Sequence, residues 1–158
     1  MAADAPEIAI PRLYNAAVDL IDRNLAAGRG AKLAFRDDKT SLTYAELAER
    51  VDRAANLLRG LGIEPEQRVL LCLLDTIDFP VMFLGAIKAG IVPVPVNTML
   101  TTQDYDFMLR DSRARALFVS DALYPRLAPI LVDQPYLRHV VVSGGPVEGR
   151  PRLADLLA

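Results

Sequence analysis

The feature that most constrains the fold is a pair of apolar segments in the middle of the chain. Residues 69–74 are six apolar residues in succession, a pattern typical of a central strand that is covered on both faces. Residues 78–89 follow as a helix. After Asp78 at its first position, Lys88 is its one charged residue. We therefore expect this helix to be buried on nearly all sides, with other elements packed around it.

Strand-like and helix-like segments alternate along the rest of the chain. This alternation predicts an α/β fold, with a mostly parallel sheet and helices on both of its faces. The expected strands are residues 31–36, 40–42, 69–74, 91–96, 116–120 and 138–142. The expected helices begin after Asn15 and near Thr43, Asp78, Thr101 and Ala122, and residues 153–158 form a short fraying helix. No internal repeat or linker divides the chain, so we expect residues 1–158 to form a single α/β domain.

Two of these helices have a capping signal at their start. Thr43 and Glu46 form a T-x-x-E capping box in front of an apolar face that recurs at helical spacing. Thr101 and Asp104 begin another helix.

Prolines predict two irregularities. Pro93 and Pro95 lie two positions apart in one strand, so both missing N–H groups face the same side, and regular pairing is not expected there. The helix over residues 122–132 should bend or restart near Pro129.

Composition and charge exclude several classes of protein. The chain is 52% hydrophobic and 24% charged, which indicates a globular rather than a disordered protein. Its net charge of −2 gives no electrostatic reason to expect nucleic acid or an anionic membrane as a partner. The nearest approach to a basic run is Arg110, Arg113 and Arg115, which we interpret as a solvated helix end.

Other features predict a cytoplasmic location. Residues 1–10 contain two acidic residues and lack the basic start of a signal peptide. The longest apolar stretch, residues 79–87, is too short to span a bilayer. The single cysteine, Cys72, lies in an apolar run and suits a reducing compartment.

Few residues offer catalytic or ligand-binding chemistry. The one histidine, His139, precedes an apolar run and has no second histidine or nearby cysteine with which to bind a metal. Residues 28–30 follow a helix, so their glycines indicate a helix stop and not a phosphate loop. Residues 143–146 do follow a strand, but Pro146 removes one amide donor. No Gly-Lys-Ser/Thr comes after them, so phosphate binding is not expected there.

Asp75 and Asp78 follow the central strand, at the edge where open α/β sheets bind ligands. We interpret Asp78 as the cap of the next helix and expect Asp75 to accept hydrogen bonds from loop N–H groups. The sequence therefore predicts no catalytic, cofactor-binding or metal-binding residue in this chain.

Two segments resemble core motifs of the adenylate-forming superfamily, which includes acyl-CoA synthetases, luciferases and peptide-synthetase adenylation domains. Residues 41–47, Ser-Leu-Thr-Tyr-Ala-Glu-Leu, resemble its first core motif, and residues 83–97 resemble its second. The stretches that resemble benzoate–CoA ligases most are residues 14–17, 75–80 and 97–100, followed by Tyr105, Asp111 and Ser112. The resemblance covers about residues 14–143.

This resemblance implies a two-step reaction in a full-length enzyme of aromatic degradation. A benzoate-like carboxylate attacks the α-phosphate of Mg·ATP, and the thiol of CoA then displaces AMP from the acyl-adenylate. In the family, the phosphate loop, the acid pocket and the C-terminal domain lie beyond the region matched here. The resemblance therefore implies an N-terminal subdomain of the large domain, which binds no ATP, Mg²⁺ or CoA and catalyses nothing alone. Some relatives have a CoA-contacting arginine near Met99, and we infer no such contact here.

Two other interpretations remain open. The chain could be a stand-alone non-catalytic α/β module that binds or regulates a partner ligase, or an unrelated nucleotide-binding domain, which the lack of a phosphate loop disfavours. If the chain is one part of a larger domain, it should expose apolar surface and self-associate.

Overall fold

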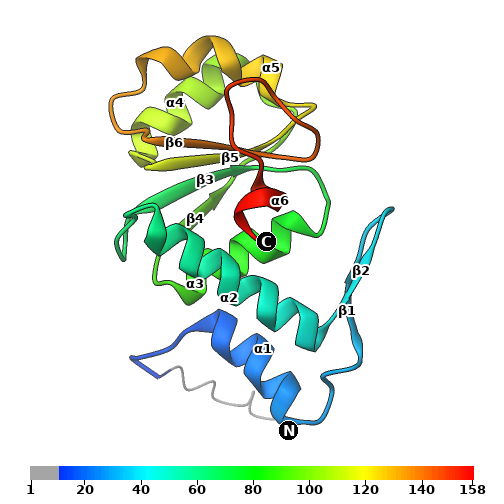
Figure 1. Cartoon of the computed structure of the whole chain (residues 1–158). Coiled ribbons are helices and arrows are strands. Elements are labelled where there is room, and N and C mark those ends of the chain that lie inside the picture. Colours follow the sequence, from blue (N-terminus) through cyan, green and yellow to red (C-terminus); the bar gives the residue numbers. More distant parts are fainter. Residues whose placement is uncertain (1–10) are drawn as a thin grey trace, which may run out of the picture.

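A computed structural model of the chain describes residues 11–158, and its centre is a parallel four-stranded sheet (Figure 1). The strands are β3 (Arg68–Cys72), β4 (Val92–Pro95), β5 (Ala116–Ser120) and β6 (His139–Ser143). They pair in the order β4-β3-β5-β6, and each pair is parallel. This arrangement confirms the predicted α/β fold and places the apolar run of β3 inside the sheet.

Helices cover both faces of this sheet. One face packs on α2 (Tyr44–Gly60) and α3 (Asp78–Lys88) through a core that contains Val69 and Leu71 of β3. The other packs on α4 (Thr102–Ser112), α5 (Tyr124–Leu127) and the 3₁₀ helix η1 (Ala128–Asp133) through a core that contains Leu70 and Cys72. Alternate residues of one strand therefore serve two cores, which explains why the run is apolar at every position.

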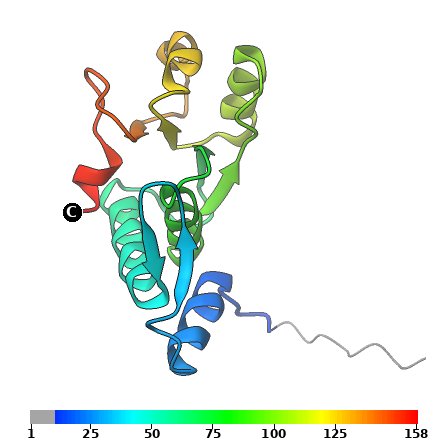
Figure 2. The same ribbon diagram turned by 90° about the vertical axis from the view of Figure 1, so that its right-hand side faces the viewer.

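A second, smaller sheet lies beside α2 and α3 and is separate from the parallel sheet. Strands β1 (Leu33–Arg36) and β2 (Ser41–Thr43) form an antiparallel hairpin beside α2 and α3 (Figure 2). Helix α1 (Ala16–Ala26) packs against α2 and α3, and α6 (Leu153–Leu156) lies near β6. Within residues 11–158, no helix is both long enough and apolar enough to cross a membrane.

The predicted caps are formed. Thr43 Oγ1 accepts a hydrogen bond from Glu46 N at 3.3 Å, and Glu46 Oε2 accepts one from Thr43 N at 2.8 Å. Thr101 and Asp104 make the same reciprocal pair at the start of α4. Because these hydrogen bonds favour the ionised carboxylates, they lower the pKa of Glu46 and of Asp104.

Helix α3 is enclosed as expected, since none of its residues is exposed. A glycine allows its close approach to α2: a Cβ atom on Gly85 would lie 2.6 Å from Ala54 Cβ and 3.3 Å from Val51 O. Such distances leave no room for a side chain, so Gly85 sets the spacing of the two helices.

The prolines act as predicted. Val92 N and Val96 N donate to carbonyl groups beside or in β3, so β4 pairs along one side only and is an edge strand. The N–H groups that Pro93 and Pro95 lack belong to the other side. Residues 122–132 form α5 and then η1, with the change at Ala128 next to Pro129.

Candidate functional site

The candidate site is the edge where the parallel strands end. Ligands of open α/β sheets bind outside this carboxyl edge. Short polar residues follow three of the strands here: Asp75, Thr76 and Asp78 after β3, Asp121 after β5, and Ser143, Gly144 and Gly145 at the end of β6. The sequence predicted the position of Asp75 and Asp78 at this edge, and the structure confirms it.

The role predicted for Asp78 is wrong. Helix α3 begins after Ile77, which has helical dihedral angles of φ −57° and ψ −27° and makes no side-chain cap. Asp78 Oδ2 instead accepts a hydrogen bond of 2.6 Å from Ser143 Oγ. Asp78 therefore joins the first turn of α3 to the end of β6, and within the described residues its carboxylate makes no capping hydrogen bond.

Asp37, in the hairpin turn, takes part of the capping role. Its Oδ2 accepts a hydrogen bond of 2.9 Å from Ile77 N, and its Oδ1 accepts from Lys39 N at 2.9 Å and Thr40 N at 2.8 Å. These three hydrogen bonds lower the pKa of Asp37, with the Ile77 contact contributing most. The sequence indicated a turn at 37–39, but it gave no sign that this turn contacts the start of α3.

The glycine-rich segment after β6 binds a carboxylate of the chain itself. Gly145 N donates to Asp121 Oδ2 at 2.6 Å, and Ala122 N donates to Asp121 Oδ1 at 2.7 Å. Gly144 has a φ of +104°, and a Cβ atom there would also lie 2.8 Å from the Asp121 carboxylate, so a glycine is favoured at that position. The amide that could have bound a phosphate oxygen is therefore used by Asp121, whose charge would repel a phosphate.

Asp75 and Thr76 lie between this edge and the hairpin. Asp75 is exposed, and within residues 11–158 its carboxylate accepts no hydrogen bond, so the expected loop contacts of Asp75 are not formed. Thr76 Oγ1 is buried without a partner in the same part of the chain.

An apolar groove of about 480 Å³ adjoins these two residues. It lies between α1, the hairpin, α2 and the start of α3, and its apolar lining includes Leu20, Phe35, Tyr44, Phe79 and Phe83. The rings of Phe79 and Phe83 are nearly parallel, with centroids 6.0 Å apart. Leu20 and Phe35 are 47% and 40% exposed, so the groove opens to solvent.

Other residues considered for chemistry have structural contacts. His139 Nε2 lies 3.0 Å from Leu61 O and joins β6 to the end of α2. Cys72 is buried, and burial raises the pKa of its thiol. Gly28 has a φ of +72° and follows the end of α1, as the helix-stop interpretation requires. In the described part of the chain, no three His, Cys, Asp or Glu residues are grouped so that they could hold a metal ion.

A protein-family model described as AMP-binding enzyme matches residues 22–155. The chain belongs to this family. The matched residues include the hairpin, the whole parallel sheet and both helical layers. This match confirms the resemblance to adenylate-forming enzymes that the two core motifs predicted.

Several relatives are named as aromatic acid–CoA ligases. The chain is 56% identical, over 97% of its length, to a benzoate–CoA ligase of Thauera aromatica. It is 48% identical, over 93% of its length, to a 4-hydroxybenzoate–CoA/benzoate–CoA ligase of Rhodopseudomonas palustris. The crystal structure of a benzoate CoA ligase from Burkholderia xenovorans superposes on 92% of this AMP-binding chain with a TM-score of 0.83 and 42% identity.

This AMP-binding chain matches only a part of each of those proteins. It spans 29% of the Thauera enzyme, 27% of the Rhodopseudomonas enzyme and 28% of the Burkholderia structure. In those relatives, the part that matches the carboxyl edge described above is therefore one portion of a larger protein. That it contains no catalytic, cofactor-binding or metal-binding residue stays a prediction.

Proposed function

We propose that this chain is the N-terminal segment of an ATP-dependent aryl acid–CoA ligase. The observation that carries the proposal is the 56% identity to a benzoate–CoA ligase over nearly the whole chain. Residues 1–158 would form one α/β domain, equivalent to the N-terminal subdomain of such a ligase. The phosphate loop and the C-terminal domain would be supplied by other parts of the enzyme. The comparisons offer no support for a stand-alone regulatory module.

The complete enzyme would convert benzoate, ATP and CoA to benzoyl-CoA, AMP and pyrophosphate. Its partners would be a benzoate-like carboxylate, ATP and CoA, with no nucleic acid and no membrane. Mg²⁺ would neutralise the phosphate charge while the carboxylate oxygen bonds to the α-phosphorus and pyrophosphate leaves. A buried reduced Cys72 and the use of ATP and CoA support a cytoplasmic location.

The part played by this chain would be structural. Its carboxyl edge carries Asp75, Asp78 and Asp121, and the hydrogen bonds of Asp78 and Asp121 go to Ser143 and to backbone amides of the chain. The carboxylates of these three residues would repel the phosphates of ATP. We therefore propose that Mg·ATP does not bind to the 158-residue chain alone.

The apolar groove supports the proposal that this is one part of a larger domain. Leu20, Phe35 and Phe79 leave an apolar surface open beside the carboxyl edge. Such a surface is normally covered by another part of a protein, and it drives association when it is not. In the ligase, the remainder of the large domain would cover this groove, and the isolated chain would self-associate through it.

A chimeric enzyme tests the function. The chain replaces the matched 29% of the Thauera benzoate–CoA ligase, and benzoate-dependent exchange between ATP and pyrophosphate is measured. We expect exchange by the chimera and none by the 158-residue chain or by the ligase without its matched segment. A chimera that folds, by circular dichroism and sedimentation, but shows no exchange would contradict the proposal. Exchange by the chain alone would contradict the structural role.

A further inference from the structure

Three arginines lie in register at the opposite edge of the sheet, where the strands begin. Val69 of β3 is paired with Ala116 of β5, which is paired with His139 of β6. The residue before each of these is an arginine: Arg68 before Val69, Arg115 before Ala116 and Arg138 before His139. We call these three residues the arginine row. Arg115 N donates to Arg68 O at 2.8 Å, and Arg138 N donates to Arg115 O at 2.8 Å, so the three are direct neighbours.

The three side chains leave the sheet on the same face. Residues two apart on a strand share a face, and the positions two beyond the row are Leu70, Leu117 and Val140. All three of these belong to the core on the α4 side. Neighbouring strands lie about 4.8 Å apart, so the row spans about 10 Å. Figure 1 shows β3, β5 and β6 starting along one edge of the sheet.

A second pair of residues extends the row. Arg113 and Tyr136 lie two positions before Arg115 and Arg138, and the Arg113 guanidinium lies 5.6 Å from the centre of the Tyr136 ring. Phe107 of α4 lines the same surface hollow as Arg113 and Tyr136, and its side chain is 65% exposed. Asp106 and Asp111 line this hollow as well, and Asp106 is paired with Arg110, so arginine and exposed aromatic side chains share the surface with two carboxylates.

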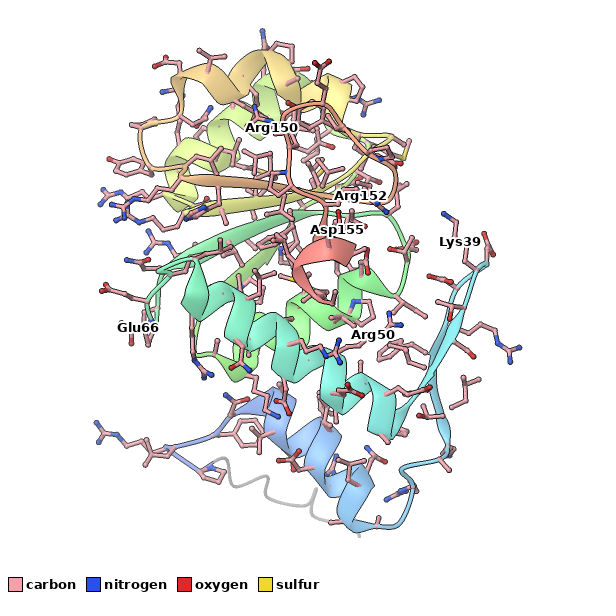
Figure 3. The ribbon with its side chains drawn as sticks, in the orientation of Figure 1. Lys39, Arg50, Glu66, Arg150, Arg152 and Asp155 are labelled. Carbon is pink, nitrogen blue, oxygen red and sulfur yellow. The ribbon has the colours of Figure 1, made fainter. Side chains whose placement is uncertain are left out.

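Most of this positive charge has no partner within the described residues. Arg68 Nε donates to Ser112 O at 2.6 Å, at the end of α4. Among residues 11–158, Arg115 and Arg138 make no side-chain hydrogen bond or ion pair, whereas Arg110 nearby is paired with both Asp106 and Asp133. Glu66, labelled in Figure 3 at the turn before β3, is not ion-paired with the row either. Like charges directly opposite on neighbouring strands are destabilising, so an acidic partner would relieve a real cost.

The surroundings favour a short acidic segment of a protein over a long phosphate polymer as that partner. The C-terminal end of α4, with its partial negative charge, lies against Arg68, and exposed Asp111 is close along the chain. A long phosphate polymer would meet these negative groups and a chain of net charge −2. A carboxylate can instead pair with one guanidinium at a time in a bidentate manner. Arginine and tyrosine are also the residue types that dominate the binding energy of protein interfaces.

We propose that the arginine row, together with Arg113 and Tyr136, is a docking surface for a protein partner that presents a short series of aspartates or glutamates. This goes beyond the ligase activity and does not depend on it. The surface lies at the amino edge of the sheet, one strand length of about 15 Å from the carboxyl edge. A partner could therefore bind here without covering the candidate site.

A synthetic peptide tests the proposal with the 158-residue chain. The probe is a fluorescein-labelled peptide with four glutamates separated by glycine and serine, and the reference peptide has glutamine in their place. Fluorescence anisotropy should show binding of the glutamate peptide only, and the affinity should fall as salt is added. The double variant Arg115→Gln/Arg138→Gln should bind about tenfold more weakly. It should unfold at the same or a higher temperature, because like-charge repulsion is reduced.

A matched control removes the same charge elsewhere. Arg29 and Arg50 are exposed, and Arg50 lies on α2 on the far side of the molecule from Glu66 (Figure 3). The variant Arg29→Gln/Arg50→Gln should bind the glutamate peptide like the unchanged chain.

No binding by the unchanged chain, or equal losses in both variants, would overturn the proposal. Pyrophosphate and a single-stranded oligonucleotide are added as competitors, with unlabelled glutamate peptide as the reference. If either competitor displaces the labelled peptide at a lower concentration than the unlabelled peptide does, the surface is a phosphate site and the proposal is overturned. Loss of a dimer in the row variant would mean that a second copy occupies the surface.

Discussion

The carboxylate of Asp37 accepts a hydrogen bond from the backbone N–H of Ile77, a residue 40 positions later in the sequence. The same carboxylate holds the hairpin turn through Lys39 N and Thr40 N. One side chain therefore closes the turn and attaches it to the start of α3, beside the carboxyl edge. The hairpin borders the apolar groove, so this contact also fixes one wall of the groove.

Replacing Asp37 with alanine should loosen the hairpin. The Asp37→Ala variant loses all three hydrogen bonds, so the turn should open more often and expose the peptide bond after Lys39. We expect faster tryptic cleavage there under native conditions. The neighbour Asp38 is exposed, and Asp38→Ala should leave the cleavage rate unchanged. Equal rates in Asp37→Ala and in the unchanged chain would show that the contact does not hold the hairpin.

The chain should become less stable in acid because four carboxyl groups of its described residues have lowered pKa values: those of Asp37, Glu46, Asp104 and Asp106. All four are stabilised as carboxylates by the hydrogen bonds they accept. Their folded pKa values lie below the unfolded values of about 4. Their contribution is therefore complete above about pH 5 and is lost as pH falls through the folded values. Urea denaturation between pH 7 and pH 3 should show this loss. The loss should be smaller in Glu46→Gln, and an equal loss in both proteins would contradict the assignment for Glu46.

The spacing of α2 and α3 predicts a cost for any side chain at position 85. A methyl group on Gly85 would overlap Ala54, and such overpacking costs about 1–3 kcal/mol. The Gly85→Ala variant should therefore be destabilised in urea denaturation. Gly60, at the end of α2, has nothing within 4 Å of its Cβ position, so Gly60→Ala should be neutral or slightly stabilising. If both variants behave alike, the two helices are not in close contact at Gly85.

Self-association should depend on the apolar groove. We expect the sedimentation coefficient of the chain to rise with concentration, and the double variant Leu20→Gln/Phe35→Gln to weaken that rise. Val132 is 94% exposed on η1, away from the groove, and Val132→Gln serves as the control. A chain that stays monomeric at high concentration would contradict the idea that a covering part is missing.

Much of the fold could be predicted because its signals are local. The capping boxes at Thr43 and Thr101 involve residues three positions apart, and the apolar run of β3 is read directly from the sequence. Pro93 and Pro95 predicted an edge because a missing N–H group acts at its own position. Each of these features depends on a few neighbouring residues.

The contacts of the candidate site could not be predicted because they depend on strand order. Asp78 meets Ser143, 65 positions away, only because β5 and β6 continue the sheet beside β3. The carboxylate of Asp121 reaches Gly145 for the same reason. The arginine row also depends on register: Arg115 was read with Arg110 and Arg113 as part of a helix end, whereas its spatial neighbours are Arg68 and Arg138. Sequence spacing alone contains no information on that pairing.

Calorimetric titration with Mg·ATP tests the central claim most directly. The claim is that this chain supplies the framework of a ligase and not the group that binds phosphate. We predict no binding heat above dilution when Mg·ATP is added to the 158-residue chain, and clear binding to the chimera with the remainder of the Thauera enzyme. Saturable binding of Mg·ATP to the 158-residue chain alone would contradict the claim.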